Sequence, residues 1–125
     1  MSFEAGQQWA YAAAPGLEDS RILIGAILDY DGGQRIACCA VLAGIERGAD
    51  GEPERVTIPF LPLTLDALAR SVTELDGTAE LPDAFADQLQ AWLDDPRGAS
   101  YFTVPFEGSL ERLIGQQMTA IVGQG

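Results

Sequence analysis

The chain has 125 residues, of which 47% are hydrophobic, so it is long and apolar enough to fold as one domain over residues 1–125. Nineteen acidic residues against seven basic ones give a net charge of −12, a field that repels nucleic acid and anionic membrane surfaces. The longest apolar run, IACCAVLAGI, has ten residues and is too short to span a membrane.

The first predicted element is a strand within residues 6–15, where Trp9 and Tyr11 share one face because strand side chains alternate. The clearest local pattern follows at residues 21–47, where two β-rich runs flank the sequence DGGQ. Gly32 and Gly33 supply the positive φ that a tight hairpin turn needs. The sequence therefore predicts a β-hairpin over residues 21–47.

This hairpin is apolar on both of its faces. Strand alternation predicts one face with Ile22, Ile24, Ala26, Leu28 and Tyr30 and another with Leu23, Gly25 and Ile27, and the second arm is equally apolar on both sides. Such a hairpin lies in the middle of a sheet or contacts something other than water on each face. We expect three helices to cover one face well and to leave part of the other for a partner or a ligand.

The chain's two cysteines, Cys38 and Cys39, are adjacent within the second arm. Neighbouring residues on a strand point to opposite faces, so a disulfide between them would be strained, and no further soft metal ligands accompany them. We predict two small, buried, reduced side chains.

A strand, RVTIPFLPL, follows, and Pro59 within it must lie at a sheet edge, a bulge or a strand end because it cannot donate to a ladder. Thr64 is predicted to cap a helix that continues to Leu75, and a second helix begins near Pro82 and Asp83. That helix is predicted to bury Phe85, Leu89, Trp92 and Leu93. The remaining elements are a strand, SYFTVPF, and a helix from Ser109 that buries Leu110, Leu113, Ile114, Met118 and Ile121. This gives an α+β fold with a mostly antiparallel sheet of four to six strands and about three helices, in the rough order β-β-β-β-α-α-β-α.

Two stretches of the chain resemble each other. Thr-Ile-Pro-Phe at residues 57–60 and Thr-Val-Pro-Phe at residues 103–106 each precede a hydroxyl residue and an apolar-periodic stretch. The echo indicates either an internal strand–helix repeat or coincidence. In either case the two Pro-Phe corners are expected at comparable edges, as a blunted edge or as a groove or dimer contact formed by Pro59, Phe60, Pro105 and Phe106.

The chemistry that the residues permit is restricted. The chain has no His and no Lys, which removes the commonest general base, the commonest metal ligand and Schiff-base chemistry. Tyr30, between Asp29 and Asp31, is the best remaining candidate for a catalytic group. The sequence DYDGG resembles the start of a calcium-binding loop, but a turn is the better interpretation. No catalytic residue is assigned, and neither a cofactor nor a metal is expected.

Two functions remain open. The first is a non-catalytic protein-interaction module, either a homodimer or an accessory subunit, and the second is a ligand-binding or enzymatic domain with a cavity against a curved sheet. The interaction module is favoured over the second function, and enzymatic activity is expected less than its absence. The N-terminal MSFEAGQQWA does not resemble a signal peptide, and abundant Ala, Gly and Asp without Lys suggest a GC-rich bacterial genome, so we expect a cytoplasmic bacterial protein.

Overall fold

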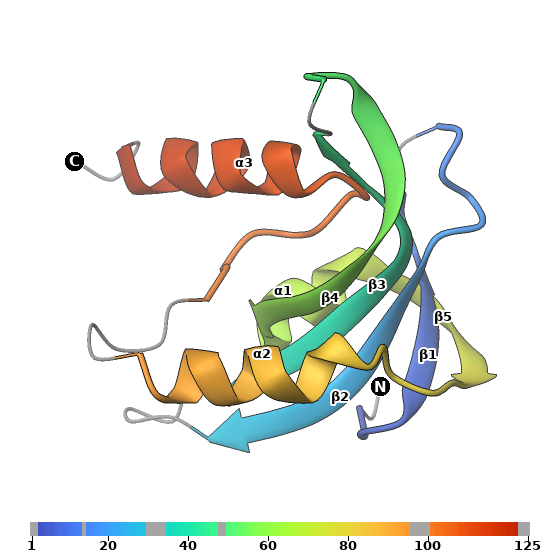
Figure 1. The fold of residues 1–125 in the computed structure, drawn as a ribbon, viewed down its shortest axis with the longest axis vertical. Helices are drawn as coiled ribbons and strands as arrows, with labels where there is room; N and C mark the ends of the chain where they lie inside the picture. The colour runs from blue at the N-terminus through green and yellow to red at the C-terminus, as the bar shows by residue number, and fades with distance from the viewer. Residues whose placement is uncertain (1–2, 14, 30–34, 48–49, 96–100, 123–125) are drawn as a thin grey trace.

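A computed structural model describes residues 3–13, 15–29, 35–47, 50–95 and 101–122 (Figure 1). Its strands are β1 (Gln7–Tyr11), β2 (Arg21–Asp29), β3 (Arg35–Arg47), β4 (Pro53–Thr64) and β5 (Val72–Thr78), and its helices are α1 (Leu65–Ser71), α2 (Ala84–Leu93) and α3 (Leu110–Val122). The predicted α+β class is confirmed: the antiparallel sheet has five strands, within the four to six predicted, and there are three helices.

The sheet has the order β4-β3-β2-β1-β5, and every neighbouring pair is antiparallel. Helix α1 links the two edge strands, β4 and β5. In a flat sheet those edges would lie about 19 Å apart, four times the usual strand spacing, whereas a helix of this length rises only about 10 Å. The sheet must therefore curl, and Figure 1 shows it wrapped around an interior.

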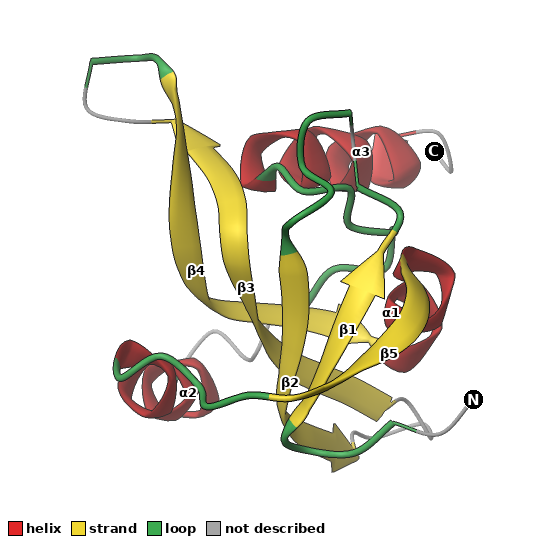
Figure 2. Ribbon diagram, turned by 90° about the vertical axis from the view of Figure 1, so that its right-hand side faces the viewer, coloured by secondary structure: helices red, strands yellow, loops and turns green. Residues whose placement is uncertain are grey.

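Both faces of the β2–β3 hairpin are covered by the chain itself. The inner cluster joins Ile22, Ile24 and Cys39 to residues of α1, α3 and the segment 102–106. The outer cluster joins Leu23 and Cys38 to residues of α2, and Figure 2 shows α1 and α2 on opposite sides of the sheet. The expectation that part of one face would be left for a partner is wrong for the centre of the hairpin, where Leu23, Cys38 and Ala40 are at most 1% exposed, while Ala26 and Leu28 toward its tip are partly buried. The concave side of the curled sheet is filled by the inner cluster, which leaves α2 to cover the convex side.

A β-bulge at Gly25 changes which residues of β2 share a face. Ile24 pairs with Cys39 and Ala26 pairs with Cys38, so Gly25 is the extra residue on β2. Beyond the bulge the alternation is reversed, and Ile27 packs on the inner cluster while Ala26 packs on the outer one. The simple two-residue alternation predicted for this strand is therefore wrong after Ile24.

The helix that follows Thr64 is shorter than predicted. Thr64 accepts a hydrogen bond from the Ala67 backbone N–H, as a capping residue should, but α1 ends at Ser71. From Val72 the chain forms β5 and pairs with β1, with Leu75 opposite Trp9. The apolar spacing of Leu68, Val72 and Leu75 fits a helix equally well, and the open edge of β1 decides between the two.

Pro59 lies on the edge strand β4 and at a bulge. Val41 pairs with Ile58 and Cys39 with Leu61, so β4 has one extra residue between these pairs, at positions 59–60. Pro59 has no N–H to donate to a neighbouring strand. At the bulge of an edge strand no such hydrogen bond is required of it, so the sheet loses none. This prediction is confirmed.

The predicted strand at residues 100–106 is instead a crossing segment, which we define as Tyr101–Ser109. It touches β4 at one end, where the Phe102 N–H donates to the Pro62 carbonyl at 3.0 Å. At its other end Gly108 accepts from the Ile45 N–H of β3 at 2.8 Å. The two Pro-Phe stretches therefore adopt different structures, a paired strand and a crossing segment, although Thr64 and Ser109 both precede a helix.

Candidate functional site

The four residues predicted to form a groove or a dimer contact are not brought together. Phe60 belongs to the outer cluster, where its ring lies 5.8 Å from Phe85 and 5.5 Å from Trp92. Phe106 is fully buried in the inner cluster, 5.4 Å from the Tyr11 ring. Pro59 and Pro105 are partly buried. A shared contact surface of Phe60 and Phe106 is excluded because they lie on opposite faces of the sheet.

Helix α3 is fixed to the body along one side. Leu113 is 1% exposed and belongs to the inner cluster. The Gln117 side-chain oxygen accepts from both the backbone N–H and the hydroxyl of Thr103, at 2.7 and 3.1 Å. Glu107 accepts from Gln116 at 3.3 Å and pairs with Arg112 at 2.6 Å. These contacts hold α3 against the crossing segment and fix which side of the helix faces outward.

Beyond its first turn, where Arg112 is exposed, the outward side of α3 carries Ile114, Gly115, Met118 and Thr119, all of which are exposed. Ile114 is 46% exposed and Met118 is 61% exposed, so the prediction that both would be buried is wrong. The predicted burial of Leu110 and Ile121 concerns side chains outside the described residues. We call the four exposed residues the α3 face.

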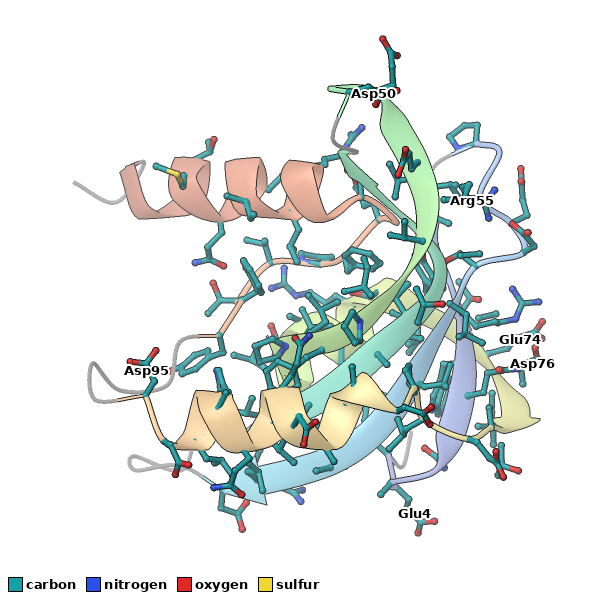
Figure 3. The ribbon with its side chains drawn as sticks, viewed as in Figure 1. Glu4, Asp50, Arg55, Glu74, Asp76 and Asp95 are labelled. Atoms are coloured by element: carbon teal, nitrogen blue, oxygen red, sulfur yellow. The ribbon has the colours of Figure 1, made fainter. Side chains whose placement is uncertain are left out.

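The α3 face contrasts with the rest of the surface in its lack of charge. From Leu113 to Gly125 the sequence has no ionisable side chain, although the chain as a whole carries a net charge of −12. In Figure 3 the labelled carboxylates of Glu4, Asp50, Glu74 and Asp95 lie at separate places around the molecule. Thus a neutral apolar helix face is presented by an otherwise acidic body.

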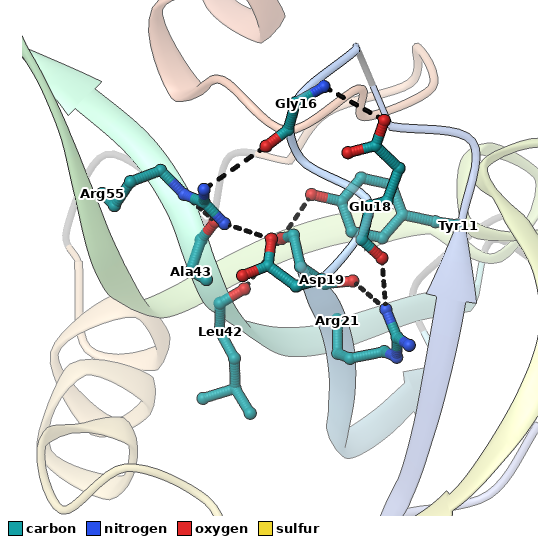
Figure 4. A network of polar contacts seen from close by, with 9 residues as sticks. Tyr11, Gly16, Glu18, Asp19, Arg21, Leu42, Ala43 and Arg55 are labelled. Carbon is teal, nitrogen blue, oxygen red and sulfur yellow. Dashed lines mark hydrogen bonds and ion pairs between the residues drawn. The ribbon is translucent and has the colours of Figure 1, made fainter.

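A polar network closes the end of the sheet near residues 16–21 (Figure 4). The Tyr11 hydroxyl donates to the Ser20 Oγ at 2.6 Å, and Ser20 donates to the Leu42 carbonyl at 2.7 Å. Burial raises the pKa of Tyr11, so its phenol stays protonated near neutral pH and acts as a donor. This chain of hydrogen bonds is structural, since each hydroxyl proton already has an acceptor.

Arg55 forms the outer part of the same network. Its guanidinium donates to the Ala43 carbonyl at 2.9 Å and to Asp19 at 2.5 Å. The hydrogen bond from Arg55 lowers the pKa of Asp19. Ala43 has a φ of 56°, in the left-handed region, and lies where the β3–β4 register shifts between Val41 and Gly44. Arg55 therefore supports a strained bulge and is not available to orient a ligand.

Replacing Tyr11 with Phe tests this network. We expect Tyr11→Phe to lower the free energy of unfolding by about 1 kcal/mol, because one buried hydrogen bond is lost while Ser20 keeps its acceptor. Ser20→Ala should cost more, about 1–3 kcal/mol, because it leaves both the Tyr11 hydroxyl and the Leu42 carbonyl without that partner. Urea denaturation measures both, and equal stability of all three proteins would contradict the network.

Both cysteines are buried and free, as predicted, and they lie in different clusters on opposite faces of the sheet. Burial raises the pKa of the Cys38 thiol to about 11. Burial also raises the pKa of Cys39, and the neighbouring Cys38 adds to this shift. Neither thiol has the lowered pKa of a nucleophile.

We expect the native thiols to be nearly inert toward a disulfide reagent at pH 8. A pKa of about 11 leaves on the order of one Cys38 in a thousand as thiolate at that pH, and burial blocks access as well. In denaturant both thiols should react at once, which the colour of the released thiolate measures. Fast modification of either thiol in the folded protein would contradict this placement.

The catalytic constellation considered at the hairpin tip lies largely outside the described residues, which exclude Tyr30 and Asp31. Asp29 is exposed and pairs with Arg35 at 3.1 Å.

Over the described ranges, no group of three or more Cys, Asp or Glu side chains could hold a metal ion. No helix among the described residues is long and apolar enough to cross a membrane. Comparisons of the chain with protein-family models, curated proteins and solved structures find no match in any of the three.

Sequence reasoning missed the α3 face because apolar residues at helical spacing were assigned to the core. A signal was present in the sequence. α3 has its charged residues, Glu111 and Arg112, in its first turn and none from Leu113 onward, whereas Asp66 and Arg70 lie near both ends of α1 and Asp87 lies within α2. A surface helix normally shows a charged side opposite its buried stripe. Beyond the first turn α3 lacks such a charged side, and the apolar Ile114 and Met118 are exposed there instead.

Proposed function

We propose that this chain is a non-catalytic protein-interaction module of the cytoplasm, homo-oligomeric or accessory, and that it contacts its partner through the α3 face. One observation carries the proposal: Ile114 and Met118 are 46% and 61% exposed on a helix whose other side is already anchored. Removing such side chains from water stabilises a complex by about 25 cal/mol for each Å² buried, before the costs of association.

A domain with a ligand cavity inside the curved sheet is less well supported. The space enclosed by the sheet is filled by Phe106, Leu61, Leu68 and Leu113, each no more than 1% exposed. Among the described residues, no buried side-chain N or O atom lacks a hydrogen-bond partner. The polar groups that would orient a ligand are therefore already engaged, which favours a function on the surface.

Site-specific photo-cross-linking tests the proposal in the cells that produce the protein. A photoreactive residue at position 118 is expected to give a discrete protein adduct. The matched control is position 75, where Leu75 is 52% exposed on β5 and is flanked by the acidic Glu74 and Asp76. No adduct at position 118, or the same adducts at both positions, would contradict an interaction surface on α3.

A further inference from the structure

Resting on the proposed function, we infer that the partner is a second copy of this chain, and that α3 packs against α3 of that copy across a two-fold axis. A two-fold contact uses the same surface on both molecules, so the surface must be complementary to itself. Three properties of the α3 face meet this requirement: its charge, its shape and its hydrogen bonding.

The first property is charge. Two copies each carry −12 and repel each other at long range, so they can associate only where contact brings no like charges together. The four residues of the α3 face are uncharged. The charged residues of the helix, Glu111 and Arg112, lie in its first turn, where Arg112 is exposed and paired with Glu107. A basic partner would gain more from the acidic parts of the body than from this neutral helix. Charge therefore favours a second copy over a basic protein.

The second property is shape. Large and small side chains share the face, with Ile114 and Met118 beside Gly115 and Thr119, the pattern that lets two helices interdigitate. A Cβ added at Gly115 would meet nothing within 4 Å, so packing within the chain does not require glycine there. Glycine inside an exposed helix costs about 1 kcal/mol relative to alanine. Close approach of a second helix accounts for this otherwise unfavourable residue.

The third property is hydrogen bonding. Thr119 contributes the only side-chain polar group of the α3 face, and its hydroxyl donates to the Gly115 carbonyl at 3.0 Å. Gln116 and Gln117, which alternate with the face, are turned to Glu107 and Thr103 on the body. Burying the face against a second copy therefore takes no unpaired side-chain donor of these four residues out of water, which lowers the penalty for desolvation.

Sedimentation velocity on the full chain tests the inference. We expect the wild type to dimerise with a micromolar dissociation constant, because one helix face is smaller than the roughly 800 Å² per partner of a standard interface. Met118→Glu and Ile114→Glu should each weaken the dimer at least about tenfold by placing a charge in the contact. Leu75→Glu, an equal change at an equally exposed site on β5, should leave it unchanged. Added salt should strengthen the dimer, since it screens the repulsion of two acidic bodies.

Two further variants examine the geometry. An equimolar mixture of Met118→Glu and Met118→Lys should dimerise more tightly than either variant alone, because a two-fold axis near α3 brings the two positions together. Gly115→Ala should raise the stability of the chain yet weaken the dimer several-fold, because the added methyl groups separate the helices. A stronger or unchanged Gly115→Ala dimer would overturn the close α3–α3 contact.

The inference and the proposed function can fail separately. A wild type that stays monomeric, while position 118 cross-links to a different protein, would overturn the second copy and leave the interaction module standing. A dimer insensitive to all α3 variants would place self-association on another surface and overturn the inference. No cross-link at position 118 together with a wild type that stays monomeric would overturn both.

Discussion

Replacing Phe106 with Ala should lower the free energy of unfolding by about 3–5 kcal/mol, the usual cost of truncating a fully buried phenylalanine. The Phe106 ring is 0% exposed and packs 5.4 Å from the Tyr11 ring. Its backbone N–H donates to the Ser71 Oγ at 2.9 Å, so the crossing segment is fixed to α1 at the same residue. The truncation would leave a cavity among the buried residues of the inner cluster. Denaturant titration monitored by tryptophan fluorescence measures the loss.

Phe60→Ala is the control, because Phe60 occupies the equivalent place in the first Pro-Phe stretch. Phe60 is only partly buried between Phe85 and Trp92. Phe60→Ala should therefore lower the free energy of unfolding clearly less than Phe106→Ala does. If the two phenylalanines formed a shared contact surface, both substitutions would instead change self-association and leave monomer stability nearly intact. Equal and small stability losses would therefore contradict the inner position of Phe106.

Gly25→Ala should destabilise the chain by about 1–3 kcal/mol through overpacking. A Cβ at Gly25 would lie 2.2 to 2.8 Å from three atoms of the Phe85 ring, far inside contact distance. Phe85 is the buried residue by which α2 packs on the sheet, so relief of the clash displaces the helix. A loss of stability would indicate the clash with Phe85, because replacing glycine with alanine at an ordinary strand position raises stability.

Two comparisons isolate the cause. Gly115→Ala makes the same chemical change where a Cβ meets nothing, and it should stabilise the chain by about 1 kcal/mol. In a double-mutant cycle, Gly25→Ala should be nearly harmless once Phe85→Ala has removed the ring, giving a coupling of about 1–3 kcal/mol. Additive effects of Gly25→Ala and Phe85→Ala would show that the glycine does not serve the α2 contact.

Local patterns in the sequence were sufficient for much of the fold. The two β-rich runs located the paired strands β2 and β3, although the predicted turn at Gly32 and Gly33 lies outside the described residues, and Thr64 marked the start of α1 through its capping hydrogen bond. The missing N–H of Pro59 restricted β4 to an edge or a bulge, and the structure has both. Each of these features depends on neighbouring residues along the chain, which is why a single sequence reveals them.

The remaining elements depend on contacts between distant residues. Val72–Thr78 becomes a strand because β1 offers an open edge, and Leu75 ends exposed despite its place in a helical pattern. The bulge at Gly25 is set by a ring from α2, sixty residues later. No pattern in the sequence indicates that residues 101–109 cross the sheet. This segment helps to fill the interior of the sheet, and both faces of the hairpin can therefore be buried within one chain.

The α3 face could not be predicted, because apolar residues at helical spacing are also the pattern that indicates a buried core. Apolar residues at helical spacing predicted burial of Leu113, Ile114 and Met118 alike, and only Leu113 is buried. Spacing defines the faces of a helix but does not say how many of them a neighbour covers. Likewise Leu93, predicted to be buried in α2, is 48% exposed.

Amide hydrogen exchange, followed by mass spectrometry below and above the dissociation constant of the dimer, tests the account most directly. We predict that β2 and β3 are protected to the same degree at both concentrations, because their two faces are covered within one chain. Protection of α3 should rise with concentration, because only that helix gains a neighbour. Concentration-dependent protection of the β2–β3 hairpin, with α3 unaffected, would show that the hairpin and not α3 needs the partner.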